Sequence, residues 1–218
     1  MSRQLRKTKP LIYVFCEGES EQAYIGFLKK NFSDAAVFDG PSAPGLFDEA
    51  DSLFQKNKKY RDRAEVTDEI WFFFDVEKKD IDKWDSRYKI IKKLRALRKS
   101  PNIKVRLLMT TACIEYWLML HYKSFAPLIE TVADKERMKA EVMKHEPDYK
   151  KGDYDSTARI AANYPTAVVN AAKTLKNLES QGLPGLEDTD ERNQWLCKNC
   201  LTFSTVHEAI LFLESLKQ

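Results

Sequence analysis

The sequence predicts an α/β protein in which helices cover both faces of a parallel sheet. Two runs, Leu11–Cys16 and Ile70–Phe74, consist of consecutive aromatic, β-branched and other apolar residues, which is typical of strands buried on both faces. Segments with helical spacing of apolar residues alternate with such runs over residues 11–109. Strands that alternate with helices pair in parallel, because each crossover helix returns the chain to the same end of the sheet.

The first part of the chain supplies the sheet and its crossover helices. Ser20 is a suitable N-cap for the first helix, and Ser100-Pro101-Asn102 ends the third. The segment Cys113–Tyr122 is apolar on nearly all sides, which predicts a buried helix. The predicted strands are 11–16, 36–38, 70–77 and 103–109, and the predicted helices of this part are 20–30, 48–60, 84–99 and 113–122.

The rest of the chain is more polar and its pattern is helical. We expect helices at 128–144, at 160–180 with a break or start at Pro165, and at 205–216, with an acidic linker at 182–190. We therefore divide the chain into an α/β core at 1–124 and a helical extension at 125–218 that packs on the core as one compact unit.

Composition excludes several classes of protein. The 218 residues carry 36 Lys+Arg and 33 Asp+Glu, a net charge of +3, so binding of nucleic acid would need local basic patches. The basic N-terminus, with Arg3 and Arg6, is either a solvated tail or an arm that contacts phosphate. The four cysteines lie mostly in apolar runs, which favours reduced thiols. No apolar stretch reaches about 18 residues, so we expect a cytoplasmic protein without a membrane span.

Three carboxylates follow the two most apolar strands. Asp75 and Glu77 end the central strand and, being two residues apart, should project to the same side. Glu17 ends the first strand, where Gly18 permits a tight turn into a helix. Ligands of parallel sheets bind at the carboxyl ends of the strands, and Mg²⁺ suits a small set of carboxylates. The alternative is that Asp75 and Glu77 only cap the charged segment that follows them.

Two other acids occupy early positions in predicted helices. Glu115 stands alone in the apolar helix 113–122, so it is protonated, paired or near a metal, or else it is a first-turn acid stabilised by the helix dipole. Glu21 is expected to be a surface acid in the first turn of its helix. His121, at the end of the helix 113–122, is expected to be a hydrogen-bonded core or interface histidine.

Other motifs are weaker. Cys197 and Cys200, with His207, have the spacing of part of a zinc site, but zinc needs four ligands and no second close pair is present. The chain has no Gly-x-x-x-x-Gly-Lys-Ser/Thr loop and no Gly-x-Ser-x-Gly elbow, which argues against a P-loop ATPase and against a serine hydrolase of that type.

Five segments resemble the RloB-like family. The run Cys16–Glu21 is similar to that family's Cys-Glu-Gly-x-x-Thr-Glu, and Phe74–Glu77 resembles its Asp-x-Asp with glutamate as the second acid. Thr111–Tyr122 resembles its Asn-Pro-Cys-Phe-Glu-x-Trp-Leu-Leu-Leu-His-Phe block. Tyr149–Gly152 resembles its Tyr-x-Lys loop, and Ser204–His207 its Ser-Thr-x-Val-His run. These segments occur in the family's order and span most of the chain.

The resemblance implies a Toprim-like fold, in which a glutamate after the first strand and an acidic pair after a later strand hold Mg²⁺ or Mn²⁺. It further implies a nuclease that cleaves DNA or RNA in phage defence or abortive infection, with a possible partner ATPase and possible homo-oligomers. Two alternatives remain, a non-enzymatic regulatory or toxin subunit that binds an ATPase or nucleic acid, and a nucleotidyl transferase. On this basis the expected metal ligands are Glu17, Asp75 and Glu77, and the further catalytic residues are Glu115 and Lys150. The expected nucleic-acid contacts are Lys78, Lys79, Lys150 and Lys151. The alternative for the loop lysines 150 and 151 is that they are merely solvated.

Overall fold

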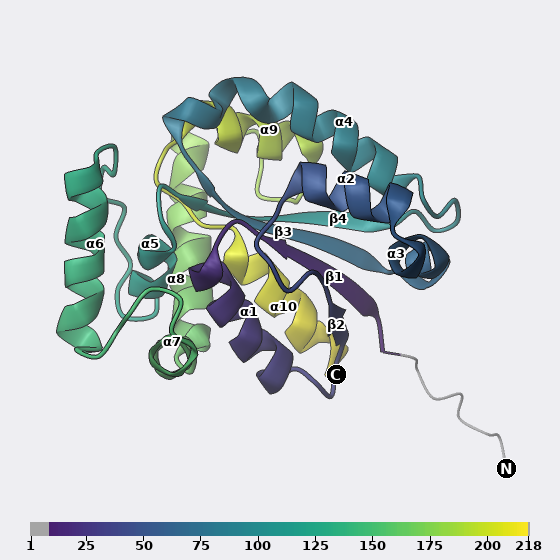
Figure 1. Ribbon diagram of the computed structural model, residues 1–218. Helices are drawn as coiled ribbons and strands as arrows, with labels where there is room; N and C mark the ends of the chain where they lie inside the picture. The colour runs from purple at the N-terminus through teal and green to yellow at the C-terminus, as the bar shows by residue number, and fades with distance from the viewer. Residues whose placement is uncertain (1–8, 218) are drawn as a thin grey trace, which may run out of the picture.

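A computed structural model describes residues 9–217 and shows a four-stranded parallel sheet between two layers of helices (Figure 1). The strand order is β2-β1-β3-β4, all neighbours being parallel. The proposed phosphate-binding arm at Arg3 and Arg6 lies outside the described residues. The strands are β1 (Leu11–Cys16), β2 (Val37–Asp39), β3 (Glu69–Val76) and β4 (Lys104–Thr111).

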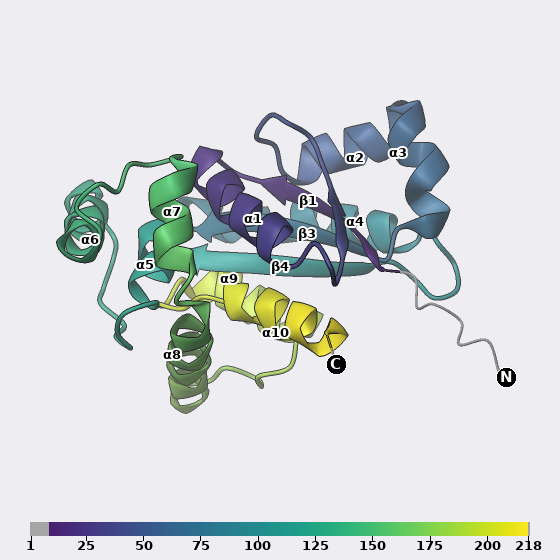
Figure 2. The same ribbon diagram turned by 90° about the horizontal axis from the view of Figure 1, so that it is seen from below.

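Alternate residues of the central strands supply two separate cores. Trp71 and Phe73 of β3 pack against one helical layer, and Phe72 and Phe74 pack against the other. The first layer contains α1 (Glu19–Asn31), α5 (Ile114–Met119), α6 (Val132–His145), α7 (Tyr154–Ala161), α8 (Tyr164–Asn177) and α10 (Val206–Leu216), and the second contains α2 (Phe47–Lys56), α3 (Lys58–Arg63), α4 (Trp84–Arg95) and α9 (Asp190–Asn199) (Figures 1 and 2). Burial on both sides explains why β1 and β3 are continuous apolar runs rather than alternating ones.

The C-terminal part of the chain completes the sheet edge. Ser204 forms an antiparallel bridge with Thr110 of β4, and the Thr205 backbone N–H donates to the Met109 carbonyl at 2.9 Å. The helix α10 then runs along the same strand (Figure 2). The edge of β4 is therefore covered near its carboxyl end, which protects an otherwise exposed edge strand. The division of the chain at residue 124 stays a prediction.

The predicted strands are confirmed, whereas two predicted helices are each interrupted and one further helix is not predicted. The helix expected at 48–60 is interrupted at Asn57, whose side chain accepts from the Lys59 backbone N–H at 3.0 Å and so caps α3. The helix expected at 160–180 is two helices that meet at Asn163, just before Pro165. The sequence analysis does not predict α9 (Asp190–Asn199), because this segment is mostly polar and has few apolar residues at helical spacing. Among residues 9–217, no helix combines the length and the apolar character needed to cross a bilayer.

Candidate active site

Glu17 and Asp75 meet at the carboxyl edge of the sheet. The residue after β1 still pairs with β3, since the Glu17 backbone N–H donates to the Phe73 carbonyl at 3.0 Å. The Glu17 carboxylate Oε2 in turn accepts from the Asp75 backbone N–H at 2.9 Å. This return contact is possible because β1 and β3 are parallel neighbours, and the last residue of β1, Cys16, is paired with Phe73, two positions before Asp75. Two residues that are 58 positions apart thus form one site.

Two further acids join them, and we call Glu17, Glu21, Asp75 and Glu115 the carboxylate cluster. Burial raises the pKa of Asp75 well above its ordinary value, and the charges of Glu21, Glu17 and Glu115 raise it further. Burial also raises the pKa of Glu21 to about 7, with added repulsion from Glu17 and Glu115. Four acids that repel one another in this way need protons or a cation between them.

Glu115 is fully buried in the first turn of α5, and one of its two oxygen atoms is satisfied. Its Oε1 accepts from the Tyr149 hydroxyl at 3.1 Å and lies 3.3 Å from the Lys151 ammonium Nζ. Its Oε2 has no hydrogen-bond partner among the described residues, and the same holds for Asp75 Oδ1. Buried oxygens without partners are costly, so each suggests a missing ligand or proton at this point.

The turn after β1 is shaped around the cluster. A Cβ at Gly18 would lie 3.0 Å from the Glu21 carboxylate Oε2, so glycine leaves room for that side chain. Ser20 Oγ accepts from the Gly152 backbone N–H at 3.1 Å, and Gly152 has φ +75°, a conformation that favours glycine. The loop that carries Lys151 is therefore fastened to the start of α1, close to Glu115.

Glu77, which the sequence predicts to act beside Asp75, is paired with two lysines. Its Oε1 accepts from Lys79 Nζ and from Lys135 Nζ, both at 3.0 Å. Burial tends to raise the pKa of Glu77, but the two lysines outweigh burial and lower it. The strand alternation that aligned Asp75 and Glu77 ends at Val76, and Lys135 comes from α6, far along the chain. Within residues 9–217, Glu17, Asp75 and Glu77 do not form a group that could hold a metal ion as they stand, and the role of Glu77 as a ligand stays a prediction.

The predicted basic contacts are spread around the site. Lys78 Nζ lies 2.5 Å from Glu130 Oε1, and Lys79 is paired with Glu77, so both already have acidic partners. Lys150 is exposed, whereas the neighbouring Lys151 reaches into the cluster. Of the two loop lysines, the structure therefore assigns Lys151, rather than Lys150, to the carboxylates.

The donor chemistry of the cluster suits a hard cation, although its side chains are not closed around one point. Carboxylate oxygens are the ligands that Mg²⁺ prefers. Within residues 9–217, no three His, Cys, Asp or Glu side chains lie close enough together to hold a metal ion as they stand. The two partnerless oxygens of Asp75 and Glu115, and the room left by Gly18, are the features that fit a cation.

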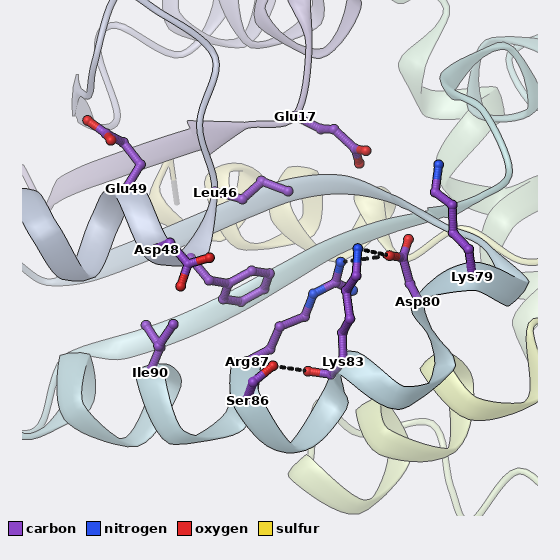
Figure 3. Close-up of a pocket in the computed structure, with 11 residues that line it drawn as sticks. Glu17, Leu46, Asp48, Glu49, Lys79, Asp80, Lys83, Ser86, Arg87 and Ile90 are labelled. Atoms are coloured by element: carbon purple, nitrogen blue, oxygen red, sulfur yellow. Dashed lines mark hydrogen bonds and ion pairs between the residues drawn. The ribbon is translucent and has the colours of Figure 1, made fainter.

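A cavity of about 420 Å³ opens beside Glu17, on the α2 and α4 side of the sheet (Figure 3). Its cationic side chains come from η2 (Lys78–Lys83) and α4, and its apolar wall comes from the start of α2 and from α4. Glu17 is thus shared between the carboxylate cluster and this cavity. The residues that line it are Glu17, Leu46, Phe47, Asp48, Glu49, Lys79, Asp80, Lys83, Ser86, Arg87 and Ile90.

The other chemical candidates have ordinary structural partners. His121 is buried and its ring contacts the Tyr24 hydroxyl at 3.2 Å and the Trp117 carbonyl at 3.1 Å, as expected for a core histidine. Cys197 Sγ lies 3.5 Å from Met109 Sδ, and Cys200 Sγ lies 3.2 Å from the Cys197 carbonyl. In the described part of the chain no third ligand joins these cysteines, so the structure does not support the zinc alternative.

The expectation that Glu21 lies on the surface is wrong, because only 4% of the residue is exposed. The signal was present in the helical spacing. Glu21 precedes Tyr24, Ile25 and Leu28 by three, four and seven positions, which places it on the buried face of α1. Tyr149, which holds Glu115, was recognised only as part of a loop motif.

Comparison with known proteins supports one assignment. The family model described as RloB-like protein matches residues 12–211, nearly the whole chain. No curated protein and no solved structure matches this chain.

Proposed function

This chain belongs to the RloB-like protein family, and on that premise we propose that it is a metal-dependent nuclease that hydrolyses phosphodiester bonds of DNA or RNA. The observation that carries the proposal is the carboxylate cluster at the carboxyl edge of the sheet, with two buried oxygens that lack partners. A repulsive set of acids is expensive to maintain, and such sites are typical of functional centres.

Glu17, Asp75 and Glu115 would hold Mg²⁺ or Mn²⁺. Glu17 is oriented by the Asp75 backbone N–H, and Asp75 Oδ1 and Glu115 Oε2 are the oxygens without partners. Glu77, the third ligand expected from the sequence, is less suitable because two lysines hold it. When bound, the cation would stabilise charge on the scissile phosphate and lower the pKa of a coordinated water.

The surrounding residues position these ligands. The Tyr149 hydroxyl and the Lys151 ammonium both contact Glu115 Oε1, so Glu115 Oε2 stays available to a cation. Lys151 is half-exposed, so its ammonium can also face an incoming phosphate. A role in phage defence, a partner ATPase, a homo-oligomer and a cytoplasmic location are further parts of this proposal, and they rest on the family resemblance and the composition.

One observation favours the non-enzymatic alternative. No three metal-binding side chains converge among residues 9–217, and Glu77 is neutralised by lysines. A subunit that retains the fold but binds only an ATPase or nucleic acid would also show these features. Metal binding separates the two possibilities.

The test is calorimetry with Mg²⁺ and with Mn²⁺ on the wild-type chain and on Asp75→Asn, which keeps the side-chain volume. Asp62→Asn, an exposed position of α3 at the far end of the sheet, is the control. We expect binding in the wild type and the control, and none in Asp75→Asn. Absence of binding in all three proteins would favour the non-enzymatic subunit.

Activity is then measured on tRNA, single-stranded DNA and plasmid, with and without the partner ATPase. Cleavage products that disappear in Asp75→Asn support the nuclease. Extended rather than shortened products would instead identify a nucleotidyl transferase. No product that depends on Asp75 under any of these conditions would refute both enzymatic functions.

A further inference from the structure

The cavity beside Glu17 has opposite charges at its two ends. Lys79, Lys83 and Arg87 gather at the end nearest to the Glu17 carboxylate, whereas Asp48 and Glu49 lie at the far end (Figure 3). The apolar side chains of Leu46, Phe47 and Ile90 line the space between these two ends. The volume of about 420 Å³ falls in the range of small-molecule sites.

The cationic end is rigidly built. Asp80 is only 5% exposed, and its Oδ1 lies 2.7 Å from Lys83 Nζ and 3.5 Å from the Arg87 guanidinium. The same guanidinium lies over the rings of Phe47 and Phe74, at 5.4 Å and 5.0 Å from their centroids. One buried acid thus organises two cations, and the set keeps an excess positive charge. Since the Lys83 side chain is 56% exposed, its ammonium has donors left for an anion.

We infer that this cavity receives one nucleotide unit of the substrate strand, with its phosphate at Lys83 and its base toward Asp48. The inference rests on the proposed nuclease function, because Glu17 belongs both to the carboxylate cluster and to the cavity wall. A phosphate at the cationic end therefore lies next to the ligands proposed to act on the adjoining phosphodiester bond. The apolar wall suits the face of a sugar and a base.

The acidic end determines which base is preferred. A carboxylate only accepts hydrogen bonds, so Asp48 favours a base edge with neighbouring donors. Guanine offers two adjacent donors, N1–H and N2–H₂, and can pair with a carboxylate through both. Uracil offers a single N3–H between two carbonyl oxygens, which a carboxylate repels. The cavity therefore selects guanine over uracil at this position of the strand.

The test uses guanosine monophosphate, uridine monophosphate and ribose 5-phosphate as probes, titrated into the full chain with Mg²⁺ and followed by saturation-transfer NMR. We expect guanosine monophosphate to bind about tenfold more tightly than the uridine nucleotide. Lys83→Met should weaken all three probes about tenfold, because a charged phosphate contact is lost. Asp48→Asn should weaken the guanosine nucleotide selectively. Lys58→Met, an exposed position of α3 outside the cavity, is the charge control and should change nothing.

Ser86→Trp is the blocking variant. Ser86 is exposed on α4 and its hydroxyl donates to the carbonyl of Lys83, the N-cap residue of that helix, so a larger side chain fills the cavity with little effect on the fold. A folded Ser86→Trp protein that binds guanosine monophosphate like the wild type would overturn the inference. So would equal binding of the two nucleotides by the wild type.

Failure of this inference is distinguishable from failure of the proposed function. If Asp75→Asn abolishes cleavage while Ser86→Trp leaves the cleavage sites and rates unchanged, the nuclease stands and the nucleotide pocket is refuted. If the wild type cleaves nothing, but binds guanosine monophosphate in a way that Ser86→Trp abolishes, the pocket stands as a nucleotide-binding site and the nuclease is refuted.

Discussion

Neutralising Glu21 should stabilise the folded protein at alkaline pH. Glu21 is buried beside Glu17 and Glu115, and its pKa is raised from 4.5 to about 7. An acid whose pKa is higher in the folded state than in the unfolded state favours folding at low pH, and this stability is lost as the pH rises toward the folded value. The affected window therefore runs from about pH 4.5 to about pH 7.

The size of the effect follows from the pKa. Each tenfold change in acidity corresponds to about 1.4 kcal/mol, so the full rise of the Glu21 pKa represents about 3 kcal/mol. Part of this stabilising free energy is already lost at pH 5, because the glutamate in the unfolded chain has partly ionised by that pH. Between pH 5 and pH 8, Glu21→Gln should therefore gain about 2 kcal/mol of unfolding free energy relative to the wild type.

The assay is urea denaturation of both proteins at pH 5 and pH 8, with EDTA present so that no cation offsets the charge. A gain of about 2 kcal/mol moves the urea midpoint by about 1 M for a chain of this size. Glu19→Gln is the matched control, since Glu19 is exposed in the same turn of α1 and its carboxylate stays in water. If Glu21→Gln and Glu19→Gln respond to pH alike, the buried, repelled state of Glu21 is refuted.

Three further predictions concern the site and the core. Mg²⁺ binding should strengthen severalfold from pH 6 to pH 8, because Glu21 in the carboxylate cluster has a pKa raised to about 7 and loses its proton over this range, and calorimetry in buffers of different ionisation enthalpy should detect proton release from the wild type at pH 6. Lys151→Met should lower nuclease activity at least about tenfold and Lys150→Met less than about twofold, since only Lys151 reaches the buried carboxylate; equal losses would contradict this assignment. Arg106→Leu should lower the unfolding free energy by about 3–5 kcal/mol, because it leaves the buried Glu69 carboxylate without its ionic partner, and adding Glu69→Leu should recover much of that loss in urea denaturation.

The sequence alone determined the sheet and the position of two acids on it. The runs at Leu11–Cys16 and Ile70–Phe74 are apolar on both faces, and this is a local property that only buried central strands require. Because parallel strands end at one edge, Glu17 and Asp75 could be placed together before any contact was known. Their hydrogen bond at 2.9 Å shows this proximity.

Only the tertiary structure decided which acids complete the site. Strand alternation predicts that Glu77 acts beside Asp75, but the Glu77 carboxylate is paired with Lys135, 58 residues further on. The buried Glu115 carboxylate likewise meets a cation from a distant loop, the Lys151 ammonium. Local periodicity indicates which side of an element a residue occupies, whereas the charge that it meets there is set by chain segments whose approach no local pattern encodes.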